Sequence, residues 1–150
     1  MTYGNKMKTR ILVLIFLTVI GLGIIDSVFK PKVKLWTYDD LPNNYVIKKE
    51  SETNMIIGKK ENNKIITKKE DKKIGLDEYI AEFSYGDKYI TLKCLNPNDE
   101  NNSIDVKFYI IDSKEEVIYG PYDLEETYLE EKAKIVDEKI SDWIKTIEIN

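Results

Sequence analysis

The clearest strand pattern in the chain is Tyr79-Ile-Ala-Glu-Phe-Ser-Tyr-Gly-Asp-Lys-Tyr-Ile-Thr-Leu-Lys-Cys-Leu95. Tyr79, Ala81, Phe83 and Tyr85 alternate with Ile80, Glu82 and Ser84, which is the two-residue period of a β-strand. Gly86-Asp87 then supplies a two-residue hairpin loop in which glycine tolerates a positive φ. Lys88 to Leu95 is the expected partner strand. The chain therefore contains an antiparallel β-hairpin.

Further short strands are predicted on both sides of this hairpin, with turn residues between them. They cover residues 45–50, 55–60 and 65–68 before it, and 105–112 and 117–119 after it. Both faces of 105–112 are apolar, which is typical of a central strand. Residues 96–103 are expected to form a polar loop that ends the ladder at Pro97, and Gly120-Pro121 is expected to end the strands. The short connections favour an antiparallel meander.

A C-terminal helix is predicted after the strands. Asp123-Leu-Glu-Glu126 has the spacing of an N-capping box. Apolar residues then recur at helical intervals, with a break near Val136 and Asp137: Leu124, Tyr128, Ile135, Val136, Ile140, Trp143, Ile144 and Ile147. The predicted fold class is α+β, an antiparallel β-meander of about six or seven short strands packed by one or two C-terminal amphipathic helices and preceded by one N-terminal transmembrane helix.

The N-terminal segment has the pattern of a membrane anchor. Residues 11–25 carry no charge and follow Lys6, Lys8 and Arg10, the basic-then-apolar order of targeting segments. Extended to Phe29, the run reaches ~28 Å, close to the thickness of a hydrocarbon core. An uncleaved signal-anchor is the main interpretation; cleavage near Gly21-Leu-Gly23 and a buried soluble helix are the alternatives.

Four segments follow from this interpretation. They are a cytoplasmic basic tail (1–10), a transmembrane signal-anchor (11–29), a connector (30–38) and an extracytoplasmic β-rich domain with a C-terminal helix (39–150). The cations that flank the apolar run slightly favour a cytoplasmic N-terminus. We therefore expect a single-pass plasma-membrane protein whose C-terminal domain lies outside.

Charge is divided unevenly along the chain. The 150 residues carry a net charge of −4, but residues 30–73 contain 12 Lys and 7 acids while residues 74–150 contain 8 Lys and 19 acids. The basic part suits anionic lipid or wall polymer, and lysines that protect exposed strand edges are the alternative. The expected partners are the membrane and an unidentified envelope protein or polymer; an acidic, outward-facing domain argues against nucleic acid.

Reactive side chains are scarce. The chain has no His and one Cys, which excludes Ser-His-Asp and Cys-His catalysis, imidazole metal sites, CxxC motifs and an intrachain disulfide. Cys94 is expected to be a small buried hydrophobe. Five acidic doublets are the plentiful groups: Asp39-Asp40, Asp99-Glu100, Glu115-Glu116, Glu125-Glu126 and Glu130-Glu131.

Neighbouring carboxylates on a strand or helix diverge instead of converging on one substrate atom. We therefore assign no catalytic, cofactor-binding or metal-binding residue and predict a non-catalytic binding domain. A small wall enzyme that uses paired carboxylates, or an immunity protein against an exported toxin, is the alternative.

Two segments resemble a known family. Leu41-Pro-Asn-Asn-Tyr-Val-Ile47 resembles its opening strand, and Phe108-Tyr-Ile-Ile-Asp-Ser-Lys-Glu-Glu-Val-Ile-Tyr-Gly-Pro121 followed by an acidic helix resembles its closing hairpin. The family consists of small Firmicute envelope proteins catalogued as domain of unknown function 3997, and the resemblance covers roughly residues 39–135. Its members often look like lipoproteins, whereas this chain lacks a lipid-accepting Cys. The resemblance implies an envelope location and no catalytic residues.

Overall fold

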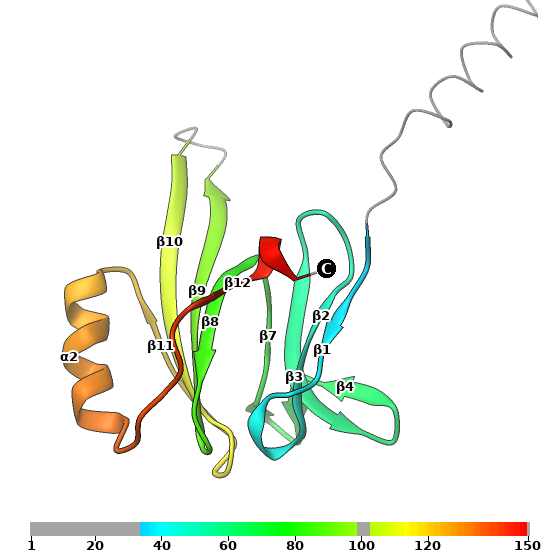
Figure 1. Cartoon of the computed structure of the whole chain (residues 1–150), viewed down its shortest axis with the longest axis horizontal. Helices are drawn as coiled ribbons and strands as arrows, with labels where there is room; N and C mark the ends of the chain where they lie inside the picture. The colour runs from blue at the N-terminus through cyan, green and yellow to red at the C-terminus, as the bar shows by residue number, and fades with distance from the viewer. Residues whose placement is uncertain (1–33, 99–102, 150) are drawn as a thin grey trace, which may run out of the picture. The chain divides into compact units, whose positions relative to one another are not determined.

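The computed structural model describes residues 34–98 and 103–149 (Figure 1). The expected basic tail and signal-anchor, and the first residues of the connector, lie outside this part of the chain. Within the described ranges, no helix is long and apolar enough to cross a membrane.

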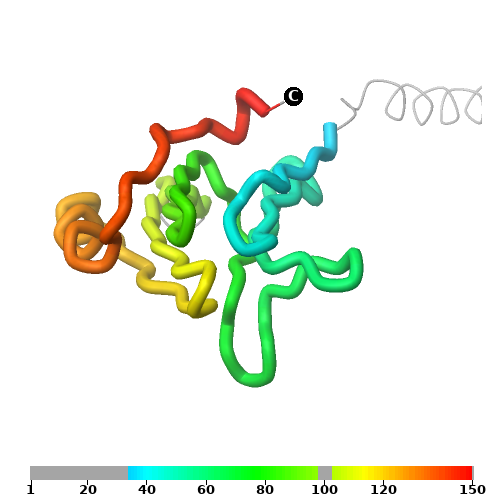
Figure 2. The backbone as a smooth tube through the Cα atoms, turned by 60° about the horizontal axis from the view of Figure 1, so that its bottom comes forward, coloured from blue at the N-terminus to red at the C-terminus, as the bar shows by residue number. Residues whose placement is uncertain are grey.

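The first sheet is antiparallel and comes from the N-terminal half of the described chain. Its strand order is β1 (Thr37–Tyr38), β2 (Tyr45–Lys49), β3 (Met55–Glu61) and β4 (Lys64–Ile66), and β7 (Leu76–Glu78) pairs with the other half of β3. A 3-10 turn, η1 (Pro42–Asn44), leads into β2. The separate two-stranded ribbon of β5 (Lys68–Lys69) and β6 (Lys72–Lys73) lies between β4 and β7 in the chain and projects from the rest (Figure 2).

The second sheet is also antiparallel and has the order β11-β10-β9-β8-β12. Its strands are β8 (Ile80–Tyr85), β9 (Tyr89–Asn98), β10 (Ser103–Asp112), β11 (Val117–Tyr122) and β12 (Ile144–Lys145). Helix α2 (Glu125–Ile135) follows β11, and a second 3-10 turn, η2 (Thr146–Glu148), follows β12.

The main core lies between the two sheets. Alternation along each strand sends one set of side chains inward, so Ile47 and Ile57 of the first sheet meet Phe83, Leu92 and other residues of the second. The opposite face of the second sheet packs against α2, where Phe108 and Tyr128 stack with ring centroids 4.9 Å apart. The layers are therefore sheet, sheet and helix, with α2 against the β10–β11 side (Figure 1).

The predicted α+β class and antiparallel pairing are confirmed, and six strands have five or more residues: β2, β3, β8, β9, β10 and β11. Strand 105–112 is central, as predicted, because β10 lies between β9 and β11. The single meander is wrong. The strands divide into two sheets because both have an apolar face, and packing these faces together removes both from water.

The hairpin of β8 and β9 is confirmed, but the role predicted for its glycine is wrong. The Gly86 amide donates to the Tyr89 carbonyl (3.0 Å), which leaves Asp87 and Lys88 as the loop residues. Gly86 does not adopt a positive φ. A Cβ at this position would lie 2.5 Å from Glu138 Oε1, so close packing is the reason for glycine.

Pro97 does not end the ladder. It pairs with Ile104, and β9 continues to Asn98. The Leu95 amide donates toward Tyr79 (2.9 Å), and the nitrogen two residues later points to the same side of the strand. Pro97 lies beyond Ile80, the first residue of β8. No β8 carbonyl therefore needs the backbone N–H that proline lacks.

Gly120-Pro121 likewise lies inside a strand. Strand β11 continues to Tyr122 through a register shift: Ile110 pairs with Tyr119, but Phe108 pairs with Tyr122. Gly120 has a φ of +104°, which a residue with a side chain rarely adopts. The irregularity absorbs both residues without ending the pairing.

The C-terminal helix is shorter than the apolar stripe predicted. Helix α2 ends at Ile135, close to the expected break, and the following residues form β12 and η2 instead of a second helix. The predicted capping box is wrong as well, because Leu124 is the N-cap and no side chain caps it. Ile144 pairs with Phe83 at the edge of the second sheet, so a strand partner overrides the local helical spacing.

Candidate binding surface

The outer face of the first sheet is built by the residues that alternate with its core residues. Lys48 lies opposite Ile56, and Lys60 lies opposite Ile65. These side chains surround a hollow of about 550 Å³. We call this surface the basic face because it has three lysines and one glutamate; its residues are Thr37, Val46, Lys48, Glu50, Ile56, Lys60, Asn63, Lys64 and Ile65. Apolar residues form its floor and lysines its walls.

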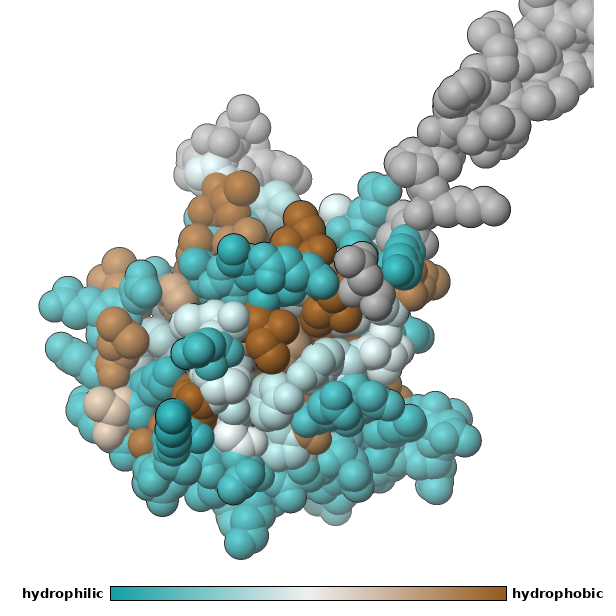
Figure 3. All heavy atoms as spheres, in the orientation of Figure 1, coloured by the Kyte–Doolittle hydropathy of each residue, from teal (hydrophilic) through white to brown (hydrophobic). Residues whose placement is uncertain are grey.

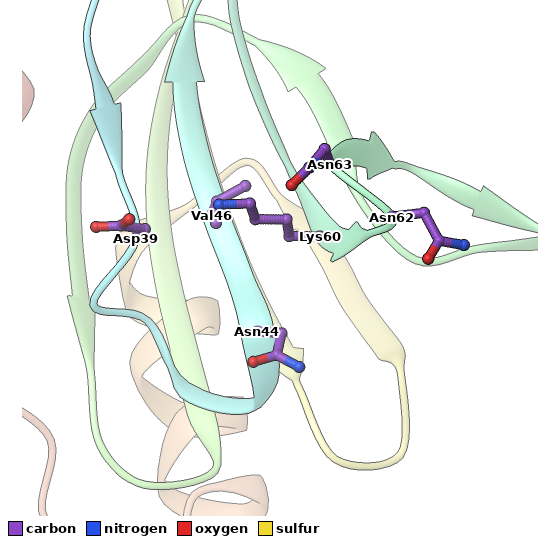
Figure 4. A pocket seen from close by; sticks show the side chains of 6 residues that line it. All are labelled: Asp39, Asn44, Val46, Lys60, Asn62 and Asn63. Carbon is purple, nitrogen blue, oxygen red and sulfur yellow. The ribbon is translucent and has the colours of Figure 1, made fainter.

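A second hollow of about 380 Å³ adjoins the first and shares Val46, Lys60 and Asn63 with it. Val46 is buried even though it lies on the outer face, and the Lys60 side chain extends across β2 beside it (Figure 4). Asp39, Asn44 and Asn62 lie at the margins of this hollow (Figure 4). The aliphatic stem of Lys60 thus covers apolar surface while its ammonium group stays accessible.

Two asparagine pairs shape the lower margin of this surface. Asn62 and Asn63 form the β3–β4 turn with φ values of 49° and 63°, and Asn43 and Asn44 precede β2 with φ values of 53° and 64°. Asparagine tolerates this left-handed region better than most residues. The backbone of these turns therefore favours asparagine, and three of the four, Asn44, Asn62 and Asn63, also line the hollow.

The lysines of the basic face differ in their ion pairs. Lys48 Nζ lies 3.0 Å from Glu50 Oε1. Neither Lys60 nor Lys64 has a carboxylate partner among the residues that the structure describes. Two unpaired cations above an apolar floor favour an anion that also has an apolar or sugar-like body.

The β5–β6 ribbon concentrates more cations. Lys68 lies opposite Lys73 and Lys69 opposite Lys72, an arrangement in which like charges destabilise the pairing. Part of this charge is compensated: Lys69 approaches Glu61 (3.9 Å) and Glu116 (3.8 Å). Lys72 donates to the Glu115 carbonyl (2.9 Å), so the ribbon is held against the β10–β11 turn.

Glu116, from one of the doublets, is an ion-pair residue. It accepts a hydrogen bond from Lys59 Nζ and lies near Lys69. The Lys59 hydrogen bond, followed by the charges of nearby lysines, holds the pKa of Glu116 below its ordinary value. A carboxylate with a lowered pKa is a poor general acid.

The described residues of the other doublets do not meet in a pair. Asp39 and Asp40 are exposed near η1, and only Asp39 lines a hollow. Glu125, Glu126 and Glu130 are exposed on α2, while Glu131 pairs with Lys134 (2.7 Å). Asp99 and Glu100 lie outside the described residues. Across the described ranges, no cluster of three acidic or thiol side chains is arranged to hold a metal ion.

The most buried charge has a structural role. Asp112 accepts hydrogen bonds from the amides of Lys114 (3.1 Å) and Glu115 (2.9 Å), and it pairs with Lys88 Nζ (3.0 Å). Hydrogen bonds to Tyr89 and Asp112 raise the pKa of Lys88. This network joins the β8–β9 loop to the β10–β11 turn.

Cys94 is fully buried in the main core, as predicted. Burial, and then the nearby Glu78 carboxylate, raise the pKa of the thiol. The thiolate form that reacts with electrophiles is therefore disfavoured.

The lysines of the basic face were missed by residue-level sequence reasoning. Two signals pointed toward them: the excess of lysine in residues 30–73, and the alternation of residues 45–50 and 55–60. Alternation shows that Lys48 and Lys60 avoid the core, but it does not show that the outer face stays uncovered.

The fold and this surface define an antiparallel β-sandwich with one helix on its second sheet and a basic, open outer face on its first. No family model, curated protein or solved structure matches the chain.

Proposed function

We propose that this chain is a membrane-anchored envelope protein whose β-sandwich binds an anionic polymer of the cell wall without catalysing a reaction. The basic face carries the proposal. Its floor is apolar, and Lys60 and Lys64 lack carboxylate partners in the described part of the chain. Phosphate or carboxylate groups would pair with these lysines while the repeating body of the polymer lies over Val46 and Ile65.

The asymmetry of the sandwich supports the same surface. Helix α2 packs on the outer face of the second sheet, whereas the outer face of the first sheet remains hollowed and open. A cationic field over an open groove raises the local concentration of an anionic ligand.

Sedimentation with isolated cell walls tests the proposal. The full chain in mild detergent is mixed with Gram-positive walls that either retain or have been stripped of their phosphate-rich polymers. Binding is expected to need the polymers and to fall with salt, because exposed ion pairs are screened. With roughly 0.7 kcal/mol per lysine–anion pair, the double variant K60Q/K64Q should bind about tenfold more weakly.

The matched control is K134Q/K139Q, which removes two exposed lysines elsewhere and lowers the net charge by the same amount. It should keep most of the binding. Equal losses in both double variants would show that net charge alone drives the interaction. Binding to stripped walls that equals binding to intact walls would reject an anionic polymer as the ligand.

The proposed topology places residues 11–29 across the membrane and the sandwich outside, and it rests on the sequence of this segment. Alkaline phosphatase fused after Asn150 is active only when it is exported. An active fusion is expected. An inactive fusion, together with an active cytoplasmic reporter at the same position, would place the domain inside.

Membership in the family catalogued as domain of unknown function 3997 is part of the proposal and rests on the two segments at residues 41–47 and 108–121. Paired-carboxylate catalysis and immunity to a toxin are the competing functions. Single Gln or Asn substitutions in each acidic doublet should leave polymer binding largely intact. Loss of a wall-degrading activity in one doublet alone would favour the enzyme.

A further inference from the structure

One end of the β-sandwich exposes large apolar side chains. Leu35, Ile104 and Ile147 are 60%, 64% and 82% exposed. A hollow of about 190 Å³ lies at the same end and is lined mainly by Tyr79, Leu95, Pro97 and Ile104. We call this surface the apolar end; its residues are Leu35, Tyr79, Leu95, Pro97, Ile104 and Ile147.

Strand register places these residues at one end although they are distant in sequence. The Lys49 amide at the end of β2 donates to the Trp36 carbonyl (2.9 Å), next to Leu35. Lys49 pairs with Met55, and Met55 with Glu78, which precedes Tyr79. The Leu95 amide donates to the Tyr79 carbonyl.

The same register continues to the remaining members of the apolar end. Pro97 pairs with Ile104 beyond this point. Thr146 Oγ1 donates toward the Ile80 carbonyl (2.7 Å), which brings Ile147 to the same end. The paired strands therefore place all these residues at the end of the sandwich where Leu35 lies.

The opposite end of the sandwich has a different character. Its turns contain Asn43, Asn62, Asp87 and Lys114, and the Lys59–Glu116 ion pair lies there as well. Hydrophilic surface covers the lower rim of the molecule in Figure 3, whereas apolar surface reaches the upper side, near the ends of β9 and β10. Large exposed apolar side chains therefore gather at one end of the sandwich, where the β2–β3 turn also exposes Glu50 and Glu52.

The described chain begins at the apolar end. Lys34 is its first residue and Leu35 the second. The uncharged run and its extension to Phe29 precede Lys34 by five residues, 30–34, of which three are lysines. Fully extended, five residues reach about 18 Å. This short length of chain is all that separates the predicted anchor from the first described residues of the apolar end in the sequence.

We propose that the apolar end docks on the surface of the lipid bilayer that anchors the chain. This inference rests on the anchor of the proposed function. Ile104 and Ile147 enter the boundary between headgroups and acyl chains, and Lys34 meets lipid phosphates. The basic face lies on the side of the sandwich and stays free for its ligand.

Weak contacts suffice because the anchor makes docking intramolecular. A short tether gives an effective concentration in the range of about 1 mM or more. Three exposed apolar side chains would bind a bilayer only marginally by themselves, as is typical of single weak membrane signals. An apolar end that is tethered this closely is expected to be docked for most of the time.

Depth-dependent quenching tests the inference. The full chain receives one extra cysteine at Ile104, Ile147, Leu129 or Asn62, and each variant is labelled with an environment-sensitive fluorophore. The native Cys94 stays unlabelled because it is buried. The variants are placed in vesicles of three parts phosphatidylcholine to one part phosphatidylglycerol that contain spin-labelled lipid. Labels at Ile104 and Ile147 should be quenched at least about twofold more than those at Leu129 and Asn62.

The controls separate two kinds of outcome. Leu129 is apolar and 53% exposed but lies on α2, and Asn62 lies at the opposite end. Flotation of the labelled protein with vesicles tests the anchor itself: failure to float rejects the anchor. Flotation with equal quenching at all four positions rejects docking and leaves the anchor intact.

A second variant provides an independent measurement. The I104D/I147D variant should float as the parent chain does. In this variant, labels on an extra cysteine at Thr53 or Ser103, near the substituted residues, should lose their quenching. Quenching that survives both aspartates would overturn the inference. A blue shift of the Ile104 label in detergent without lipid, dependent on protein concentration, would instead show a second copy of the chain at this end.

Discussion

Tyr128→Phe is expected to make the protein more stable. Tyr128 is 1% exposed, and its hydroxyl has no hydrogen-bond partner of normal geometry in the described part of the chain. The neighbouring Thr91 hydroxyl is engaged by Ser84 (2.6 Å). Burial raises the pKa of Tyr128, and the nearby Thr91 hydroxyl offsets part of that rise.

The magnitude follows from two opposing contributions. An unsatisfied buried hydroxyl costs about 1–3 kcal/mol of desolvation, which phenylalanine does not incur. The space left by one oxygen atom costs about 0.3 kcal/mol. The ring stays in place, so its stacking with Phe108 and its contact with the Lys132 ammonium are kept. The free energy of unfolding should therefore rise by about 0.7–2.7 kcal/mol.

Tyr45→Phe is the matched control because the same atom is removed from a satisfied site. The Tyr45 hydroxyl donates to the Ile74 carbonyl (3.0 Å) within the core. Its loss removes a hydrogen bond and leaves a buried carbonyl without that donor. We expect a decrease of about 1–2 kcal/mol, opposite in sign to the effect at Tyr128.

Urea unfolding of the full chain in mild detergent measures both variants. Circular dichroism follows the sheets, and the fluorescence of Trp36 and Trp143 follows tertiary structure. Coincident transitions with an unchanged m-value permit the comparison of free energies. A loss of 1 kcal/mol or more for Tyr128→Phe would show that its hydroxyl is hydrogen-bonded, and the reasoning would be wrong.

Three further predictions concern packing and ionisation. Gly86→Ala places a Cβ 2.5 Å from Glu138 Oε1, which accepts hydrogen bonds from the amides of Lys88 and Tyr89 (both 2.9 Å). The same urea assay should show that the free energy of unfolding falls by about 1–3 kcal/mol. An unchanged midpoint would contradict the close approach. Cys94 should react with a thiol-specific chromogenic reagent only after urea is added, since burial raises its pKa and blocks access; rapid labelling of the folded chain would refute this. Burial also raises the pKa of Tyr45 and of Tyr109, so the unfolded state loses these protons first and stability should fall as the pH rises above about 10. Tyr45→Phe should reduce that fall, and a stability that is constant between pH 9 and 11 would count against it.

Local regularities were predictable from particular residues. The alternation of Tyr79 to Tyr85 and the polar turn that follows predicted β8, β9 and their loop, and both faces of β10 were read correctly. These features depend on side chains a few residues apart, which the sequence shows directly. The burial of Cys94 followed from its place beside Ile90 and Leu92 on one strand face.

Apart from the capping box, the failures involve the presence or absence of a partner that is distant in sequence. The sequence predicts that the strands end at Pro97 and at Gly120-Pro121. Pro97 is tolerated inside β9 because no strand pairs with that side of it, and Gly120-Pro121 is tolerated inside β11 because the register shifts opposite Phe108. The stripe that continues to Ile147 has helical spacing, yet the edge of β8 recruits Ile144 as a strand. Gly86 lacks a side chain because the carboxylate of Glu138, 52 residues later in the chain, packs against it.

The candidate surfaces show the same division. The residues alone exclude His-based chemistry, show that lysine is concentrated in residues 30–73, and predict short antiparallel strands followed by a helix. Tertiary packing is what divides the strands into two sheets, covers one outer face with α2, and brings Leu35, Ile104 and Ile147 to one end. The physical reason is that a strand's period is set by its own residues, whereas which faces are buried depends on how all the apolar faces of the chain can be covered at once.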